Sequence, residues 1–300
     1  MNLRRLEYFI AIAEDGSLRA AARRLHVTPP SLSQQIKILE REVGGELLER
    51  LPRGIRLTPA GRAFLPEARA AVLAAHSGAR AARAAFALES AQLEIATVFS
   101  LAVGVLPQAI QLLRADYPGM SIRLFEYRHR ELLLDAVIGG IADVGFGPLP
   151  TSEQVSVELL GYESFVAIVG TEHPAFNARD PVPIRDFSGD DWVLFPPGHG
   201  LLDLVLDICA RAGFVPHDAI RTGQVEAAVR LAAAGLGVAI VPGNTVPGDL
   251  ADHVVRIDPP IYRPLAVFTR GVWSPQAAAF RTALERISWE RLPANAIHDI

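Results

Sequence analysis

The pattern of apolar positions near the amino end predicts two short helices separated by a tight turn. In the first helix, one face carries Leu18, Ala21, Ala22 and Leu25, and Ser17 precedes them as a candidate N-cap. The residues His26-Val27 form the predicted turn. This arrangement is typical of a helix-turn-helix.

The second helix has the stronger amphipathic pattern. Thr28 is a candidate N-cap, and Pro29 at the first helical position loses only an amide that has no partner within the helix. Apolar residues then recur at spacings of four, three and four, and they are Leu32, Ile36, Leu39 and Val43. We expect this stripe to be buried.

The other face of the second helix is small, polar and almost neutral. A rotation of about 100° per residue places these side chains opposite the apolar stripe. Hydroxyls, amides and one ammonium suit base edges and phosphates, and their modest bulk lets a helix enter a major groove. The candidate DNA-binding residues here are Thr28, Pro30, Ser31, Ser33, Gln34, Gln35 and Lys37. The same residues also suit a solvent-exposed helix face, so context decides between the two interpretations.

The segments on either side complete a small domain. Before the pair, Leu3, Leu6, Phe9, Ile10 and Ala13 predict an amphipathic helix that ends at Asp15-Gly16. After the pair, residues 49–57 predict a short β-hairpin with a turn at Pro52-Arg53-Gly54. Such a wing lies over the phosphate backbone, which makes Arg53 a further candidate DNA contact, and Arg50 and Arg56 are similarly placed. The alternative is ordinary solvated arginine.

Charge separates the two ends of the 300-residue chain. Residues 1–88 contain 14 Lys and Arg against 8 Asp and Glu, whereas residues 89–300 contain 15 against 25. A basic front on an acidic body is typical of a nucleic-acid module attached to a larger domain. Hydrophobic residues make up 50% of the sequence, which indicates globular domains. A single cysteine, Cys209, and the lack of a signal or membrane-spanning segment predict a cytoplasmic protein without a membrane partner.

Several motifs in order resemble the amino terminus of LysR-type transcriptional regulators. They are Leu3-Arg-Arg-Leu-Glu-Tyr-Phe, Gly16-Ser-Leu-Arg-Ala-Ala-Ala, Leu25-His-Val-Thr-Pro-Pro-Ser-Leu-Ser-Gln-Gln-Ile, Leu39-Glu and Leu57-Thr-Pro-Ala-Gly. The resemblance implies a winged helix-turn-helix, a linker helix and a two-lobed, periplasmic-binding-protein-like effector domain. It also implies dimers or tetramers on interrupted dyad operators. Two departures are Pro29, where many members carry Gln, and Leu48, where Phe is usual.

A long helix is predicted from Thr58-Pro59 to about Glu89. Apolar residues alternate along it at three and four, forming a seam of Leu65, Ala68, Val72, Ala75, Ala79, Ala82 and Phe86. We expect this seam to pair two chains, as the resemblance implies. The alternative is a simple alanine-rich helix.

From residue 91 strands alternate with helices, which predicts an α/β domain with parallel strands. The expected organisation is a winged helix-turn-helix over 1–58, a linker helix over 59–89 and an effector domain over 90–300. By the resemblance, the effector domain has a first lobe at 91–161 and 268–300 and a second at 162–267. Strands near Leu160 and Leu265 cross between the lobes.

Ligands in open α/β sheets bind beyond the carboxyl ends of strands, where helices begin. This rule and the resemblance select the same loops as the effector site. The candidates are Ser100, Leu101, Arg128, His129, Gly147, Pro148, Pro197, His199, Thr222 and Gln224. Each polar residue among them also suits a capping or loop role. The ligand expected is a small acid or an amino acid.

Motifs for catalysis are missing from the sequence, which has no HExxH, GxSxG or P-loop pattern. The eight histidines have no ligand spacing with cysteine or carboxylates, so we expect no metal and no cofactor. The sequence therefore predicts a ligand-responsive, DNA-binding transcriptional regulator that binds double-stranded DNA as a homo-oligomer. Two alternatives remain: an enzyme in which DNA binding is secondary, and a constitutive DNA binder without sequence preference.

Overall fold

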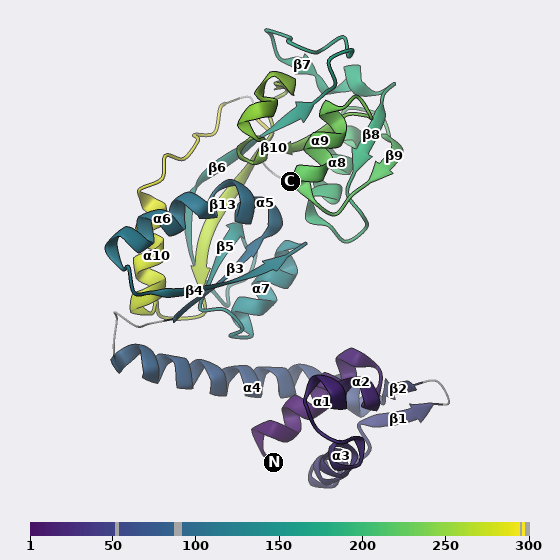
Figure 1. Ribbon diagram of the computed structural model, residues 1–300, viewed down its shortest axis with the longest axis vertical. Helices are drawn as coiled ribbons and strands as arrows, with labels where there is room; N and C mark the ends of the chain where they lie inside the picture. Colours follow the sequence, from purple (N-terminus) through teal and green to yellow (C-terminus); the bar gives the residue numbers. More distant parts are fainter. Residues whose placement is uncertain (52–53, 87–91, 295, 298–300) are drawn as a thin grey trace. The chain divides into compact units, whose positions relative to one another are not determined.

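The computed structural model describes residues 1–51, 54–86, 92–294 and 296–297 (Figure 1). The chain divides into two compact units, the first mainly Met1–Arg83 and the second mainly Ala84–Ile138 with Ala142–Ile300. The first unit has one hydrophobic core and the second has two.

Three capped helices open the first unit, and they are α1 (Leu3–Asp15), α2 (Leu18–Arg24) and α3 (Pro29–Val43). The predicted caps are confirmed: Ser17 accepts from the Ala20 N–H and Thr28 from the Ser31 N–H, both at 3.4 Å. The first helix ends at Gly16, whose φ of 59° is the left-handed conformation that glycine adopts without strain.

The predicted stripes form the core of this unit, except at the helix ends. Phe9, Leu32 and Leu39 are fully buried. Leu3 and Val43, predicted to belong to the stripes, are instead exposed at 40% and 38%. They occupy the first position of α1 and the last of α3, beyond the reach of the neighbouring helices.

The predicted hairpin is confirmed as an antiparallel pair of strands, β1 (Leu48–Leu51) and β2 (Gly54–Leu57). A long helix, α4 (Pro59–Phe86), follows, and the Thr58 hydroxyl caps it by accepting from the Gly61 N–H at 2.9 Å. The prediction for residues 87–89 lies outside the described residues.

Over the first half of α4, the predicted apolar seam packs against the helix's own unit. Ala68 and Val72 are buried in the core of the winged helix-turn-helix, and Leu65 packs against that core. The prediction that the seam pairs with a second chain is therefore wrong at Ala68 and Val72, because their own unit covers them, whereas Leu65 is half-buried. Ala63, Ala70 and Ala74 lie on the exposed side of the helix.

The second unit is built on a seven-stranded sheet in the order β10-β6-β13-β5-β3-β4, with β11 also pairing to β6. Its strands are β3 (Gln92–Val98), β4 (Ser121–Tyr127), β5 (Val144–Pro148), β6 (Ser156–Ile168), β10 (Ala239–Pro242), β11 (Val254–Val255) and β13 (Tyr262–Thr269). Strand β3 runs parallel to β4 and β5, whereas β13 runs antiparallel to both β5 and β6. The crossing strands predicted near Leu160 and Leu265 are thus confirmed as β6 and β13.

Helices cover both faces of the parallel part of this sheet (Figure 1). Crossovers of one hand place α6 (Leu106–Asp116) and α7 (Arg130–Ile138) on opposite faces, because β4 lies outside β3 and β5 lies inside it. Helix α10 (Pro275–Glu285) packs beside α6. Two helices were not predicted from the sequence: α10, and the short α5 (Phe99–Gly104), which places Ser100 in a helix rather than in a loop.

The remaining elements surround the second core of this unit. They are α8 (Gly200–Arg211), α9 (Val225–Ala233), the parallel pairs β8 (Asp191–Leu194) with β9 (His217–Arg221) and β7 (Val182–Pro183) with β12 (Ile257–Asp258), and the 3-10 turns η2 (Ile184–Phe187), η3 (Gly243–Thr245) and η4 (Gly248–His253). The long strand β6 reaches both cores of this unit. Phe165 belongs to this core, whereas Leu160 packs against the other.

Candidate functional site

The polar face of α3 is open to solvent while its apolar stripe is buried. Ser31, Gln34 and Lys37 are exposed, and so are Thr28 and Pro30. The division between the two faces follows the predicted helical rotation. The helix can therefore present hydroxyl, amide and ammonium groups to a duplex without unfolding.

Two other predicted residues of α3 are less accessible. Gln35 is half-buried, and its Oε1 accepts from Arg5 Nε on α1 at 3.1 Å. That contact orients the Gln35 side chain toward its own domain. Ser33 is also half-buried. The exposed residues are thus the better candidates for direct contact with bases.

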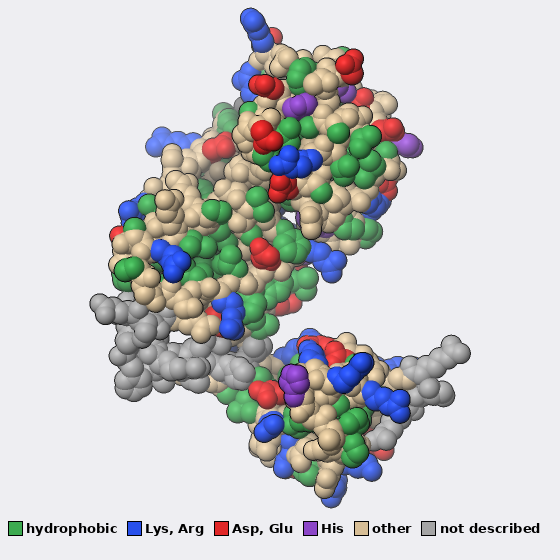
Figure 2. All heavy atoms as spheres, in the orientation of Figure 1, with side chains coloured by type: hydrophobic (Ala, Val, Ile, Leu, Met, Phe, Trp, Pro, Cys, Tyr) green, Lys and Arg blue, Asp and Glu red, His purple; other side chains and the backbone are tan. Residues whose placement is uncertain are grey.

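The surface of this unit carries many cations, as Figure 2 shows in blue. One wing cation, Arg56, is paired across the hairpin with Glu49 at 2.7 Å. Arg53 and the side chain of Arg50 lie outside the described residues. Lys37 and Arg41 are exposed on α3 without such a carboxylate partner among the residues that the structure describes.

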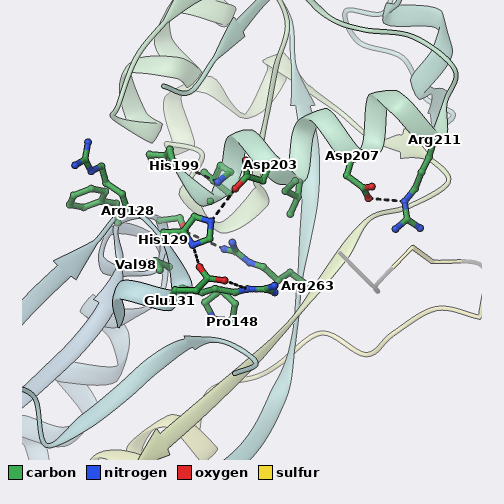
Figure 3. Close-up of a pocket in the computed structure, with 16 residues that line it drawn as sticks. Val98, Arg128, His129, Glu131, Pro148, His199, Asp203, Asp207, Arg211 and Arg263 are labelled. Carbon is green, nitrogen blue, oxygen red and sulfur yellow. Dashed lines mark hydrogen bonds and ion pairs between the residues drawn. The ribbon is translucent and has the colours of Figure 1, made fainter. Parts of the chain in front are cut away.

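A cavity of about 450 Å³ in the second unit lies at the carboxyl ends of strands β3, β4 and β5 (Figure 3). The N-terminus of α8 and strand β13 close its other side. Its lining residues are Val98, Phe99, Ser100, Arg128, His129, Arg130, Glu131, Pro148, His199, Gly200, Leu201, Asp203, Leu204, Asp207, Arg211 and Arg263.

Half of the predicted effector residues line this cavity, and they are Ser100, Arg128, His129, Pro148 and His199. The other half do not. Leu101 is fully buried in the core next to α5. Gly147 faces α7, where a Cβ would lie 3.1 Å from Leu133, because successive residues of a strand point to opposite faces.

Three predicted residues after β8 and β9 are also outside the lining of the cavity. The Thr222 hydroxyl accepts from the Gln224 N–H at 3.3 Å at the start of α9, which is the local role that the sequence left open. The side chains of Gln224 and Pro197 are exposed.

A buried ion pair at the cavity was missed by the sequence analysis. Arg263 on β13 and Glu163 on β6 are direct cross-strand neighbours, exposed at only 8% and 3%. Arg263 Nε donates to Glu163 Oε1 at 2.6 Å, and Nη2 donates to the Ser100 hydroxyl at 3.3 Å. Asn244 Nδ2 donates to the second carboxylate oxygen of Glu163 at 3.2 Å. The only signal in the sequence was one arginine in the mostly apolar strand β13 and two glutamates, Glu158 and Glu163, in β6.

Polar contacts join the loop after β4 to helix α8 across the cavity (Figure 3). His129 Nε2 lies 3.0 Å from Asp203 Oδ2, and His129 Nδ1 contacts Glu131. The Gly200 N–H donates to the Arg128 carbonyl at 2.9 Å. The two core regions of this unit are therefore tied together at the cavity by bonds that a ligand or a lobe movement can replace.

His199 caps helix α8 from within the cavity lining. Its Nδ1 accepts from the Leu201 N–H at 3.2 Å, and its ring stacks on Phe195 with centroids 4.6 Å apart. Burial, followed by the charges of Arg128 and Arg263, lowers the pKa of His199 to about 4. The imidazole is therefore neutral at pH 7, with its proton on Nε2.

Other reactive chemistry is sparse in the described part of the chain. No three His, Cys, Asp or Glu residues gather there as a metal site. Cys209 is fully buried, and burial raises the pKa of its thiol to about 12, which makes it unreactive. No described helix combines the length and the apolar character that a bilayer span requires.

Comparison with known proteins gives a family match in each of the two units. Residues 3–62 match the family described as "Bacterial regulatory helix-turn-helix protein, lysR family", and residues 87–288 match the "LysR substrate binding domain". The chain belongs to the LysR family of transcriptional regulators.

Several LysR regulators resemble this chain over most of its length. The regulator TfdS of Cupriavidus pinatubonensis is 34% identical over 247 residues, covering 81% of this chain and 83% of its own. BenM of Acinetobacter baylyi is 31% identical over 278 residues and covers 91% of both. The crystal structure of CbnR, a LysR family transcriptional regulator, matches with a TM-score of 0.69 and 28% identity over 95% of this chain and 99% of that one. A further match is full-length CbnR complexed with its target DNA, with a TM-score of 0.68 and 27% identity over the same shares.

Family membership confirms the predicted winged helix-turn-helix and two-lobed effector domain. This LysR regulator therefore has a DNA-binding domain and an effector-binding domain, and its named relatives are transcriptional regulators.

Proposed function

We propose that this protein regulates transcription by binding an interrupted dyad operator as a dimer or tetramer, under the control of a small effector in the cavity. The observation that carries the proposal is the exposed polar face of α3, held in place by the buried stripe of Leu32, Ile36 and Leu39. A helix of this kind fits the major groove, where amide and hydroxyl groups distinguish base pairs.

DNA contacts divide into two kinds under this proposal. Gln34 and Ser31 read base edges, with the half-buried Ser33 next to them, whereas Lys37 and Arg53 contact phosphates and set the register. Thr28, Pro30 and Gln35 complete the surface that approaches the groove. Two copies on one operator place their α3 helices about 34 Å apart, or multiples of that spacing, along the duplex.

Pairing of two chains requires a surface on each of them. The exposed side of α4, with Ala63, Ala70 and Ala74, remains open for a partner after the first half of the seam has packed against its own domain. Small side chains allow two helices to approach closely. We infer that this side of α4, rather than Leu65, Ala68 and Val72, forms the dimer contact.

The effector, a small acid or an amino acid, binds in the cavity lined by Ser100, Arg128, His129, Pro148 and His199. The contacts between His129 and Asp203 and between Gly200 and Arg128 hold the cavity in one arrangement. A ligand that exchanges these contacts for its own shifts the population of lobe arrangements. The oligomer then presents its DNA-binding domains at a different spacing.

A mobility-shift experiment tests this function. The full chain is titrated onto the DNA upstream of its own gene and onto a shuffled duplex of equal length, with and without a panel of small acids and amino acids. We expect tighter binding to the upstream DNA and a change in affinity or mobility with at least one panel member. Equal affinity for both duplexes and no ligand effect would overturn the proposal, and turnover of a bound ligand would favour an enzyme.

A further inference from the structure

The nitrogen Nε2 of His199 is a buried polar atom without a hydrogen-bond partner among the described residues. His199 is 3% exposed and lines the cavity. Its Nδ1 already accepts from the Leu201 N–H, so the neutral ring carries its proton on Nε2 and presents a donor there. A buried donor without an acceptor is costly, and native proteins satisfy such groups with a protein atom, a water or a ligand.

The positive charge that can act together with this donor is that of Arg128. Four arginines line the cavity, and three of them are neutralised by carboxylates: Arg130 by Glu131, Arg211 by Asp207 and Arg263 by Glu163. The side chain of Arg128 makes no hydrogen bond or ion pair with the residues that the structure describes. Among the charged residues, Arg128 lowers the pKa of His199 the most, and Asp203 acts in the opposite direction.

These two observations select one kind of ligand group. A donor that carries no charge of its own, in a positive potential, suits an anionic oxygen acceptor better than a neutral one. The apolar liners Val98, Phe99 and Pro148 suit the rest of a small ligand.

We propose that His199 determines the preference of the cavity for an acid, by donating its Nε2–H to a carboxylate oxygen of the effector beside Arg128. This inference rests on the proposed function, since it identifies the group that the effector cavity recognises. The imidazole acts as a neutral donor with a fixed tautomer, because the cap bond to Leu201 keeps Nδ1 occupied.

Matched acids and amides test the proposal by calorimetry on the full chain. The probes are acetate, benzoate and succinate, each compared with its carboxamide at millimolar concentration. We expect at least one acid to bind, and to bind at least 10-fold more tightly than its amide. Absence of binding by every acid, or equal affinity for acid and amide, would overturn the proposal.

Substitution of His199 tests the role of this residue. Phe keeps the ring that stacks on Phe195 but removes the donor, so His199→Phe is expected to weaken acid binding about 10- to 100-fold, as loss of a charge-assisted hydrogen bond does. Gln restores an amide donor near the position of Nε2, so His199→Gln is expected to recover part of that loss. The matched control is His217→Phe, because His217 is exposed on β9 outside the cavity. Equal acid affinity in His199→Phe and the wild type would contradict the assignment.

Histidine ¹⁵N NMR of the wild type provides a readout that needs no variant. The expected result is the Nε2–H tautomer for His199 before acid is added, and a change in its Nε2 shift on binding. An Nδ1–H tautomer, or no change at saturation, would contradict the proposal. If an acid changes the DNA affinity while His199→Phe and the NMR shift show no effect, the proposed function stands and this inference fails.

Discussion

Arg263 and Glu163 face each other across strands β13 and β6, with Nε and Oε1 2.6 Å apart and both side chains almost fully buried. These are the strands that cross between the two cores of the effector domain. The pair also holds the Ser100 hydroxyl and the Asn244 amide. This ion pair thus links strands β13 and β6 beside the cavity, at the point where the lobes join.

Removal of one partner leaves the other as an uncompensated buried charge. We expect Glu163→Gln to lower the free energy of unfolding of the effector domain by about 3–5 kcal/mol. The double variant Glu163→Gln with Arg263→Met is expected to be less destabilised than the single one, since no lone charge remains. Urea unfolding of the wild type, Glu163→Gln, Arg263→Met and the double variant checks this, and a double variant whose loss equals the sum of the two single losses would contradict it.

We expect α3 to determine discrimination between DNA sequences and the wing to determine general affinity for DNA. We expect Gln34→Ala to reduce discrimination between operator and shuffled DNA by about 1–3 kcal/mol, because a base contact is lost. Arg53→Ala is expected to weaken binding to both duplexes alike and to reduce the salt dependence, because a phosphate contact is lost. Anisotropy titrations at several salt concentrations provide the measurement. Equal losses on both duplexes for both variants would remove this division of roles.

Packing of α4 on its own domain gives a prediction about stability. Ala68 is 1% exposed in the core, so Ala68→Leu is expected to destabilise the DNA-binding domain by about 1–3 kcal/mol through overpacking. Ala71→Leu is the matched control at an exposed position of the same helix that lies outside the proposed dimer contact, with an expected effect within about 0.5 kcal/mol. Thermal unfolding distinguishes them, and the reverse order would mean that the buried side of α4 is assigned wrongly.

The neutral His199 predicts that the effector domain loses stability in acid. Its pKa is lowered from 6.5 to about 4 in the folded chain, so the unfolded chain binds more protons between these two values. The free energy of unfolding therefore falls as pH drops from 6.5 toward 4, by about 3 kcal/mol at most from this group.

The matched measurement is unfolding across that pH range for the wild type, His199→Gln and His217→Gln. Replacement of the buried imidazole is expected to flatten the pH dependence. The exposed His217 control is expected to keep the wild-type slope. A wild-type slope in His199→Gln would show that another group causes the acid sensitivity.

Cys209 is expected to be inert in the native protein. It is the only cysteine in the chain, and burial raises its thiol pKa to about 12. A disulfide reagent such as dithiobis(nitrobenzoic acid) is expected to react slowly in buffer and rapidly after unfolding in urea. Equal rates would mean that α8 opens readily in the folded state.

The amino-terminal domain could be predicted closely because its signals are local. A cap residue, a helical spacing and a turn glycine each act within one helical turn, and Ser17, Thr28 and Gly16 all take their predicted roles. The exposure of residues at helix ends was harder to predict, because the exposure of Leu3 and Val43 depends on where the neighbouring helices end.

Properties that depend on distant residues were not accessible in the same way. The apolar residues of the α4 seam have the same spacing whether the seam packs against another chain or against its own domain. Only the fold shows that Ala68 and Val72 are buried in the core of the amino-terminal domain. Likewise, Arg263 and Glu163 lie 100 residues apart, and their pairing follows from the register of β13 on β6. The rule of strand ends found Ser100, His129 and His199, but could not tell which strand ends meet at one cavity.

Footprinting on the upstream DNA tests the central claim most directly. The full chain is bound to that duplex, and protection from nuclease cleavage is mapped on both strands. The account predicts two protected half-sites related by a dyad, with centres one helical turn of about 10 base pairs, or a multiple of it, apart. In Gln34→Ala, the half-sites are expected to be protected no more than the flanking DNA. Uniform protection along the duplex, unchanged by that substitution, would contradict it.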